Sequence, residues 1–336
     1  MADPQPNPAK LVVVAGAASG PAPQPKRTQA RIGPDQIFKW LTLAGALSLV
    51  AVVLIIFVEL VYHSRLAISK FGLRFFVGNT WDPVGGDFGA LPFIYGTLVS
   101  SLIALVIAVP LGIGVAVFIN EICPRALRGP LSFTVELLAA VPSVIYGLWA
   151  IFVLAPFLRV HVDPTLAKRL GWTGLFTGPV YGVGMLAAGI ILAIMVVPFI
   201  SSITREVMLT VPQHQREGVL ALGATQWEMI RIGILRNARV GIVGGVMLGL
   251  GRALGETMAV TMVIGNRPEI AKSLFAPGYT MASMIANEFT EATGNLYLSA
   301  IIEIGLALFL LTLVVNALAR LLIWMTTRGS PSRVYG

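Results

Sequence analysis

Charged residues are scarce in this sequence. They make up only 12% of the 336 residues, whereas soluble domains carry about 25% charged residues. Hydrophobic residues account for 56% of the chain, and the mean hydropathy is +0.82. This composition excludes one large soluble domain and predicts a membrane protein that crosses the bilayer several times.

Cysteine and the common catalytic motifs are also missing or nearly so. Cys123 is the single cysteine and there are three histidines, so the chain cannot form an internal disulfide and shows no metal-ligand spacing. No G-x-x-x-x-G-K-[ST] loop is present, which excludes ATP binding by a P-loop of its own. H-E-x-x-H and G-x-S-x-G motifs are absent as well. A membrane enzyme is therefore the least favoured class, and no cofactor or metal is expected.

The formal net charge of +8 raises the question of nucleic acid as a partner. The basic residues neither cluster on one predicted helix nor alternate with exposed aromatic residues, so nucleic-acid binding is not expected. Most of the 24 lysines and arginines instead fall in alternate segments between apolar runs, on the side that also holds both termini. Because cytoplasmic loops carry the excess of Lys and Arg, we expect a multi-pass protein of the plasma membrane with both termini in the cytoplasm.

Six apolar runs are long enough to cross a membrane, since a spanning helix needs about 20 mostly apolar residues. The predicted spans are Phe38–Tyr62, Phe93–Ile119, Leu131–Phe157, Val180–Ile203, Val240–Ile264 and Leu298–Met325. The fold class is thus an all-α polytopic membrane protein. Its six-helix membrane domain would cover residues 38–325, between a disordered cytoplasmic tail over residues 1–37 and a C-terminal cytoplasmic tail over residues 326–336.

The longest cytoplasmic segment, residues 204–239, carries helix start and stop signals. Pro212 suits the first turn of a helix, and Gly223 can end that helix in a left-handed conformation. Thr225 and Glu228 are spaced as a capping box for a second helix. We therefore predict two short helices joined at a glycine, with an apolar face that docks to a partner.

The same segment resembles the coupling loop of ABC-importer permeases at Glu217, at Gly223 and over residues 232–235. Two other stretches, "GRALGETMAVTMVIGN" (251–266) and "AAVPSVIYGLW" (139–149), together with the last apolar run, resemble the phosphate-specific, PstC-type branch of that family. The resemblance extends over about residues 35–328.

The resemblance implies a type I ABC importer permease fold and the uptake of inorganic phosphate, powered by a separate ATPase. The implied partners are a second related permease subunit, two cytoplasmic ATP-binding subunits and an extracytoplasmic phosphate-binding protein, in addition to membrane lipid. Glu217 and Gly223 would then belong to the loop that receives motion from the ATPase.

Arg252 and Glu256 fall inside the predicted span Val240–Ile264, where an unpaired charge costs about 2.5–3.5 kcal/mol. Their spacing of four places them on one helical face, so an ion pair is expected. In the functional interpretation, Arg252 faces a wet path and meets an anion, because its planar guanidinium suits phosphate. Glu256 would hold Arg252 when no substrate is present. The structural alternative is a buried pair that only fixes helix register.

Glu136 is a further candidate for the substrate path. It lies near the cytoplasmic start of the predicted span Leu131–Phe157, ahead of Pro142. Lining of an inner gate and a simple interfacial position are both compatible with this place.

Two alternative transport functions stay open at this point. An intramembrane arginine does not separate phosphate from sulfate or molybdate, so a permease for another oxyanion fits the same residues. A proton-coupled secondary carrier that uses membrane carboxylates as relays is less favoured, because it leaves the glycine-joined loop unexplained. That carrier would lose uptake on addition of a protonophore at constant ATP.

Replacement of Gly223 by Asp tests the coupling role of the loop. We expect Gly223→Asp to leave assembly of the transporter largely intact and to block transport. Uptake and assembly are measured on the same membranes, and unchanged uptake by the variant would show that this loop does not couple.

Overall fold

The computed structural model describes residues 34–327, so most of both predicted tails lies outside the described residues. The elements, in chain order, are α1 (Pro34–Phe71), η1 (Gly72–Phe76), β1 (Trp81–Asp82), β2 (Asp87–Phe88), α2 (Leu91–Val117), η2 (Phe118–Ile122), α3 (Arg125–Ala140), α4 (Ser143–Trp149), η3 (Ala150–Leu154), α5 (Ala155–Phe157), η4 (Leu158–Val162), α6 (Asp163–Leu170), η5 (Gly171–Thr173), α7 (Met185–Leu209), α8 (Gln213–Ala221), α9 (Gln226–Glu228), η6 (Met229–Leu235), α10 (Arg236–Gly255), α11 (Met258–Val263), α12 (Met281–Glu288) and α13 (Asn295–Thr327).

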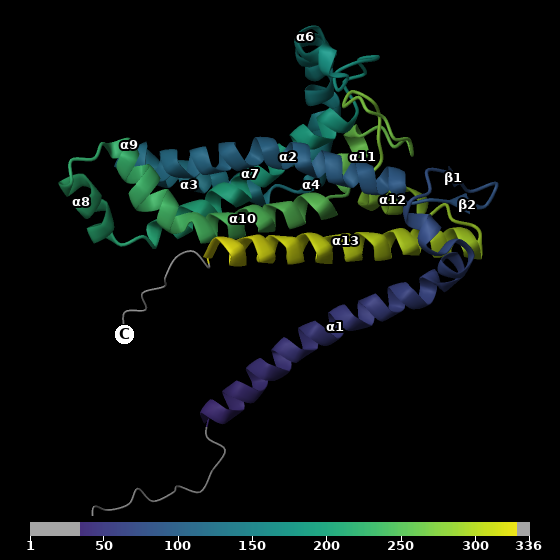
Figure 1. Cartoon of the computed structure of the whole chain (residues 1–336), viewed down its shortest axis with the longest axis horizontal. Coiled ribbons are helices and arrows are strands. Elements are labelled where there is room, and N and C mark those ends of the chain that lie inside the picture. Colours follow the sequence, from purple (N-terminus) through teal and green to yellow (C-terminus); the bar gives the residue numbers. More distant parts are fainter. Residues whose placement is uncertain (1–33, 328–336) are drawn as a thin grey trace, which may run out of the picture. The chain divides into compact units, whose positions relative to one another are not determined.

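The chain divides into two compact units at Leu54 and Ile55. In the first unit, residues 34–54 form the beginning of α1, a continuous apolar helix whose side chains are exposed. All other elements belong to the second unit, in which α2, α7, α10 and α13 form an elongated bundle (Figure 1).

Six helical stretches are long and apolar enough to cross a membrane, which confirms the predicted number. They are Asp35–Phe76, Leu91–Ile122, Ser143–Thr173, Met185–Leu209, Gln226–Gly255 and Asn295–Met325. The predicted boundaries of the second and last spans agree with these stretches. The first predicted span, Phe38–Tyr62, ends too early, because its helical stretch continues to Phe76, and the boundaries of the other three spans also need correction.

The third predicted span, Leu131–Phe157, is wrong at its start. Helix α3 ends at Ala140, and a separate helical stretch begins at Ser143 after Pro142. Val141 is extended, with φ −64° and ψ 130°, because a residue that precedes proline is driven out of the helical region. The membrane-crossing stretch therefore begins only at Ser143, and α3 is a helix of its own.

The fourth predicted span, Val180–Ile203, begins too early and ends too early. Residues 180–184 precede α7, and Gly182 and Gly184 have φ values of +76° and +154°, which interrupt a right-handed helix and favour glycine. Helix α7 continues to Leu209.

The loop before the fifth span is partly as predicted. Helix α8 follows Pro212, Gly223 is left-handed with φ +84°, and the capping box between Thr225 and Glu228 is formed. The prediction of a second short helix is wrong, however, because the helical stretch that starts at Gln226 continues without interruption to Gly255. Capping starts this helix, but the sequence offers no stop signal before the membrane.

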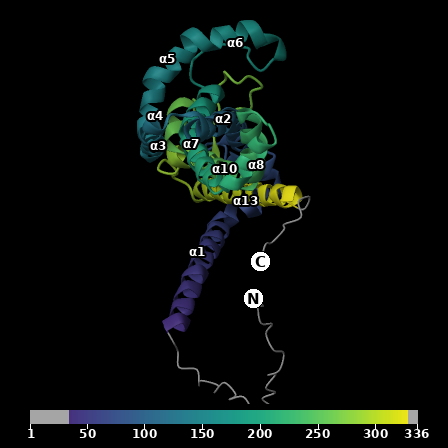
Figure 2. The same ribbon diagram turned by 90° about the vertical axis from the view of Figure 1, so that its left-hand side faces the viewer.

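Helix α7 is the centre of the second unit. It packs against α2, α10, α3 and α11, and 67% of the residues in its most apolar part are buried. Viewed from the end of the bundle, α3, α4, α5 and α6 follow one another around its outside (Figure 2). Small residues allow such close packing of membrane helices, and a Cβ at Gly189 would collide with Ile103 of α2.

A separate apolar cluster joins the ends of three spans to the loop helix α8. It contains Ala116, Val117, Met208, Val211, Met229, Ile230, Ile234, Ala238 and Ile242, and Val219 of α8 packs against it. We name this group the α8 cluster. At the other end of the bundle, a short antiparallel hairpin pairs Trp81 with Phe88 and belongs to an aromatic cluster.

Two glycines of α2 give a matched test of this packing. A Cβ at Gly96 would collide with the main-chain carbonyl of Tyr279, whereas a Cβ at Gly114 would meet no atom within 4 Å. We expect Gly96→Ala to destabilise the protein by about 1–3 kcal/mol through overpacking. Gly114→Ala should be neutral or stabilising by up to about 1 kcal/mol, since alanine is the better helix former.

The measurement is the thermal unfolding midpoint of the purified transporter in detergent. Equal midpoints for the two variants would contradict the close approach of α2 to the segment that contains Tyr279.

Candidate functional site

The fifth membrane-crossing helix stops inside the predicted span Val240–Ile264. Helix α10 ends at Gly255, and Glu256 is extended with φ −70° and ψ 126°. A new helix, α11, begins only at Met258. Non-helical backbone inside a membrane is tolerated where protein buries it or where it lines a cavity, and transporters place substrate sites at such breaks.

The predicted ion pair between Arg252 and Glu256 is wrong. The helix ends between the two residues, so they no longer share one helical face, and no ion pair joins them. Within residues 34–327, the Arg252 guanidinium makes no hydrogen bond, and its Nε is buried without a partner. Arg252 does lie in the fifth membrane-crossing stretch, but its expected counter-ion Glu256 follows the end of that stretch on extended backbone.

Two other interactions stabilise the charge of Arg252. Its Cζ lies 4.4 Å from the centroid of the Phe199 ring in α7, a cation–π contact that stabilises by about 0.5–2 kcal/mol. Arg252 also occupies the last turn of α10, where the helix dipole favours a cation. Neither interaction uses the N–H donors of Arg252, so these donors stay available to an anion. Hydrogen bonds from arginine to an anion are charge-assisted and can be bidentate, which makes them strong.

The break also brings together the two sequence stretches that carried the resemblance. Helix α4 packs against α11, and a side chain at Gly147 would collide with Met262 and Ala259. Tyr146 of α4 lies close enough to Arg252 for an electrostatic interaction between the two groups. Helices α4, α10 and α11 therefore surround one place, although the stretches are far apart in the sequence.

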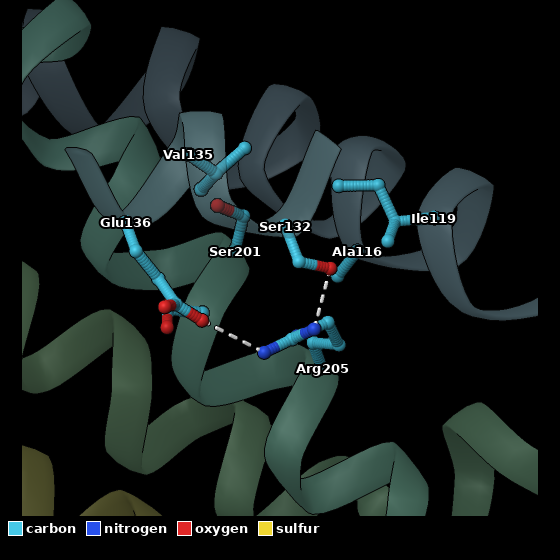
Figure 3. Close-up of a pocket in the computed structure, with 8 residues that line it drawn as sticks. Ala116, Ile119, Ser132, Val135, Glu136, Ser201 and Arg205 are labelled. Atoms are coloured by element: carbon cyan, nitrogen blue, oxygen red, sulfur yellow. Dashed lines mark hydrogen bonds and ion pairs between the residues drawn. The ribbon is translucent and has the colours of Figure 1, made fainter. Parts of the chain in front are cut away.

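Glu136 lies at a second place, on α3. Its Oε1 accepts a hydrogen bond of 2.9 Å from Nη2 of Arg205 in α7, and Nη1 of Arg205 donates to Ser132 Oγ (Figure 3). These side chains border a small cavity together with Ala116, Ile119, Val135, Ser201 and Ser202. The Glu136 side chain is 54% exposed and that of Arg205 is 23% exposed. Arg205 was not predicted as a site residue, because nothing in the sequence pairs residues that are 69 positions apart.

Glu217 and Gly223 lie on the loop at the end of the bundle where Figure 1 places α8 and α9. Glu217 is exposed and accepts a hydrogen bond of 2.9 Å from Gln213 Nε2. Next to Gly223, Leu222 is 89% exposed, and Trp227 is 61% exposed. This loop therefore presents a carboxylate and large apolar side chains on one exposed segment, as expected for a docking surface.

Metal chemistry finds no support in the described part of the chain. Across residues 34–327, no three His, Cys, Asp or Glu side chains gather in a group that could hold a metal ion. The candidate functional residues thus lie at three separate places: an arginine at a helix break, an ion pair between α3 and α7, and an exposed loop.

Comparison with known proteins gives the same class of protein. Residues 108–323 match the model of the family described as "Binding-protein-dependent transport system inner membrane component". The chain is 50% identical to the "Phosphate transport system permease protein PstC" of Mesorhizobium japonicum over 290 residues, which cover 85% of this chain and 89% of the relative. It is 47% identical to the protein of the same name from Haemophilus influenzae, over 86% of this chain and 93% of the relative.

Solved structures support the fold. A bacterial ABC transporter involved in the import of the acidic polysaccharide alginate contains a chain that matches with a TM-score of 0.56. The identity is 19%, and the match covers 85% of this chain and 97% of the other. At this identity the likeness concerns the fold alone, and it confirms the expected ABC importer permease fold.

Proposed function

The chain belongs to the binding-protein-dependent transport system inner membrane components, and from this premise we propose what it carries and how. It is a permease subunit, not an enzyme, of an ABC importer that moves inorganic phosphate across the plasma membrane. Relatives at 50% and 47% identity over most of the chain, both named phosphate transport system permease proteins, support phosphate as the substrate. Alternating access of the permease would be driven by ATP hydrolysis on a separate subunit.

The observation that carries the proposal is the unpaired guanidinium of Arg252 at the break between α10 and α11. We place Arg252 on the substrate path, where its N–H donors replace part of the hydration shell of phosphate. Phe199 holds the cation in position without consuming donors. Glu256 lies within the break and would line the gate there.

Glu136 and Arg205 would form an inner gate between α3 and α7. An ion pair with an exposed partner contributes only about 0–1 kcal/mol of stability, since water and salt screen it. Such a pair opens at low cost, which suits a contact that must break once in each transport cycle.

The exposed loop around Glu217 and Gly223 would dock to a cytoplasmic ATPase. In this arrangement the chain works with a second related permease subunit, two ATP-binding subunits and an extracytoplasmic phosphate-binding protein, and both of its termini lie in the cytoplasm. The apolar side chains next to Gly223 support a protein contact.

Replacement of Arg252 tests the substrate path. We expect Arg252→Gln to reduce phosphate uptake by about 10- to 100-fold, because a lost hydrogen bond to a charged partner costs about 1.5–3 kcal/mol. Arg252→Lys should retain part of the activity, since it keeps the charge but loses the planar fork. The measurement is labelled-phosphate uptake by membranes with equal amounts of assembled transporter.

Arg125→Gln is the matched control, because Arg125 is an exposed arginine at the start of α3, which is not one of the helices α4, α10 and α11 at the break. Glu136→Gln, measured in the same assay, should lower uptake while assembly stays normal. Normal uptake by Arg252→Gln would remove Arg252 from the path, and normal uptake by Glu136→Gln would assign its ion pair to packing alone.

A further inference from the structure

The most buried ion pair in the described part of the chain lies beside the residues assigned so far. Nη1 of Arg216 lies 2.9 Å from Oε1 of Glu121, and the two side chains are 22% and 7% exposed. By contrast, the pair of Arg205 and Glu136 has one partner that is 54% exposed. Surface pairs are screened, whereas a buried pair resists separation because each half would be left as an uncompensated charge.

One guanidinium connects three elements at this place. Arg216 belongs to α8, and its Nη2 donates a hydrogen bond of 2.9 Å to the main-chain oxygen of Met208 in the last turn of α7. Glu121 belongs to η2, the π-helical end of the second membrane-crossing stretch. It also accepts a hydrogen bond of 2.7 Å from Asn120 Nδ2. The fork of arginine is suited to such simultaneous contacts, because its donors have a fixed geometry.

Helix α8 is also fixed to the fifth membrane-crossing stretch. Nδ2 of Asn237 in α10 donates a hydrogen bond of 2.9 Å to Oε1 of Gln215 in α8. Val219 packs against the α8 cluster, which contains residues from the ends of α2, α7 and η6. Helix α8 and the ends of three spans are thus packed as one block, in which Arg216 and Glu121 form the ionic connection.

Two neighbouring residues of α8 lie on different sides of the helix, since successive helical residues are about 100° apart. Glu217 is exposed to solvent on the loop, whereas Arg216 turns towards α7 and η2. Arg216 is therefore one of the contacts, together with Gln215 and Val219, by which a displacement of α8 would be passed to the membrane helices.

We propose that Arg216 is a positioning residue that transmits movement of α8, through Glu121 and the Met208 carbonyl, to the ends of the second and fourth membrane-crossing stretches. The inference rests on the proposed contact of this loop with an ATPase. In this proposal, Arg216 determines how much phosphate is transported for each ATP hydrolysed, and Arg252 recognises the phosphate.

The complete transporter, reconstituted in proteoliposomes with its ATPase and binding protein, tests the proposal. Labelled phosphate accumulated and ATP hydrolysed are measured on the same sample. We expect Arg216→Gln to lower the phosphate-to-ATP ratio by about threefold or more, in the range by which residues along a coupling network change coupling. Arg125→Gln is the matched control and should keep the ratio. A purely structural role would lower both rates together and leave the ratio unchanged, which would overturn the proposal.

A double variant covers the case in which Arg216→Gln assembles poorly, because Glu121 is then buried without a partner. Glu121→Gln with Arg216→Gln removes both charges, and removal of both partners is tolerated better than removal of one. We expect the double variant to assemble normally and to keep a low phosphate-to-ATP ratio. A normal ratio in this variant would show that the ion pair does not transmit movement.

Gly223→Asp in the same proteoliposomes separates the two proposals. If it blocks transport while Arg216→Gln keeps a normal ratio, the loop couples and only the role of Arg216 is wrong. If Gly223→Asp changes neither uptake nor hydrolysis, the loop does not contact the ATPase and both proposals fail.

Discussion

The constraint on which this structure depends is the positive charge of Arg252 inside a membrane-crossing stretch. A charge in such a stretch needs compensation, and within residues 34–327 the structure supplies it without a carboxylate. Helix α10 ends one turn after Arg252, so its dipole favours the cation, and the Phe199 ring lies 4.4 Å away. The helix stops there, α11 begins at Met258 and packs against α4, and the donors of Arg252 make no hydrogen bond within residues 34–327.

Charges at three places in the protein differ in burial, and the difference fits their proposed tasks. Arg252 is held by a ring and a helix end, which leaves hydrogen-bond capacity for a substrate. Arg205 and Glu136 form a partly exposed pair, which can open at low cost. Arg216 and Glu121 form a buried pair, which keeps α8 and the membrane helices together. The proposed binding, gating and transmission would thus each use an arginine in a different degree of burial.

Local signals allowed much of the fold to be predicted from the sequence. The apolar runs fixed the number of spans, Gly223 took the left-handed conformation, and Thr225 with Glu228 formed the capping box. Long-range features were missed for a physical reason. Arg205 and Glu136 are 69 residues apart and Arg216 and Glu121 are 95 apart, so only the packing of helices brings them together. The helix end at Gly255 was missed because an intact helix also satisfies the spacing of Arg252 and Glu256.

Labelled-phosphate uptake in cells with and without this chain is the most direct test of the central claim. Uptake is measured in ATP-depleted cells and, separately, in cells treated with a protonophore at constant ATP. Uptake that disappears without the chain, falls with ATP and survives the protonophore is the predicted result. Uptake that follows the proton gradient would contradict the role of the loop, and unchanged phosphate uptake with loss of sulfate or molybdate uptake would contradict the substrate.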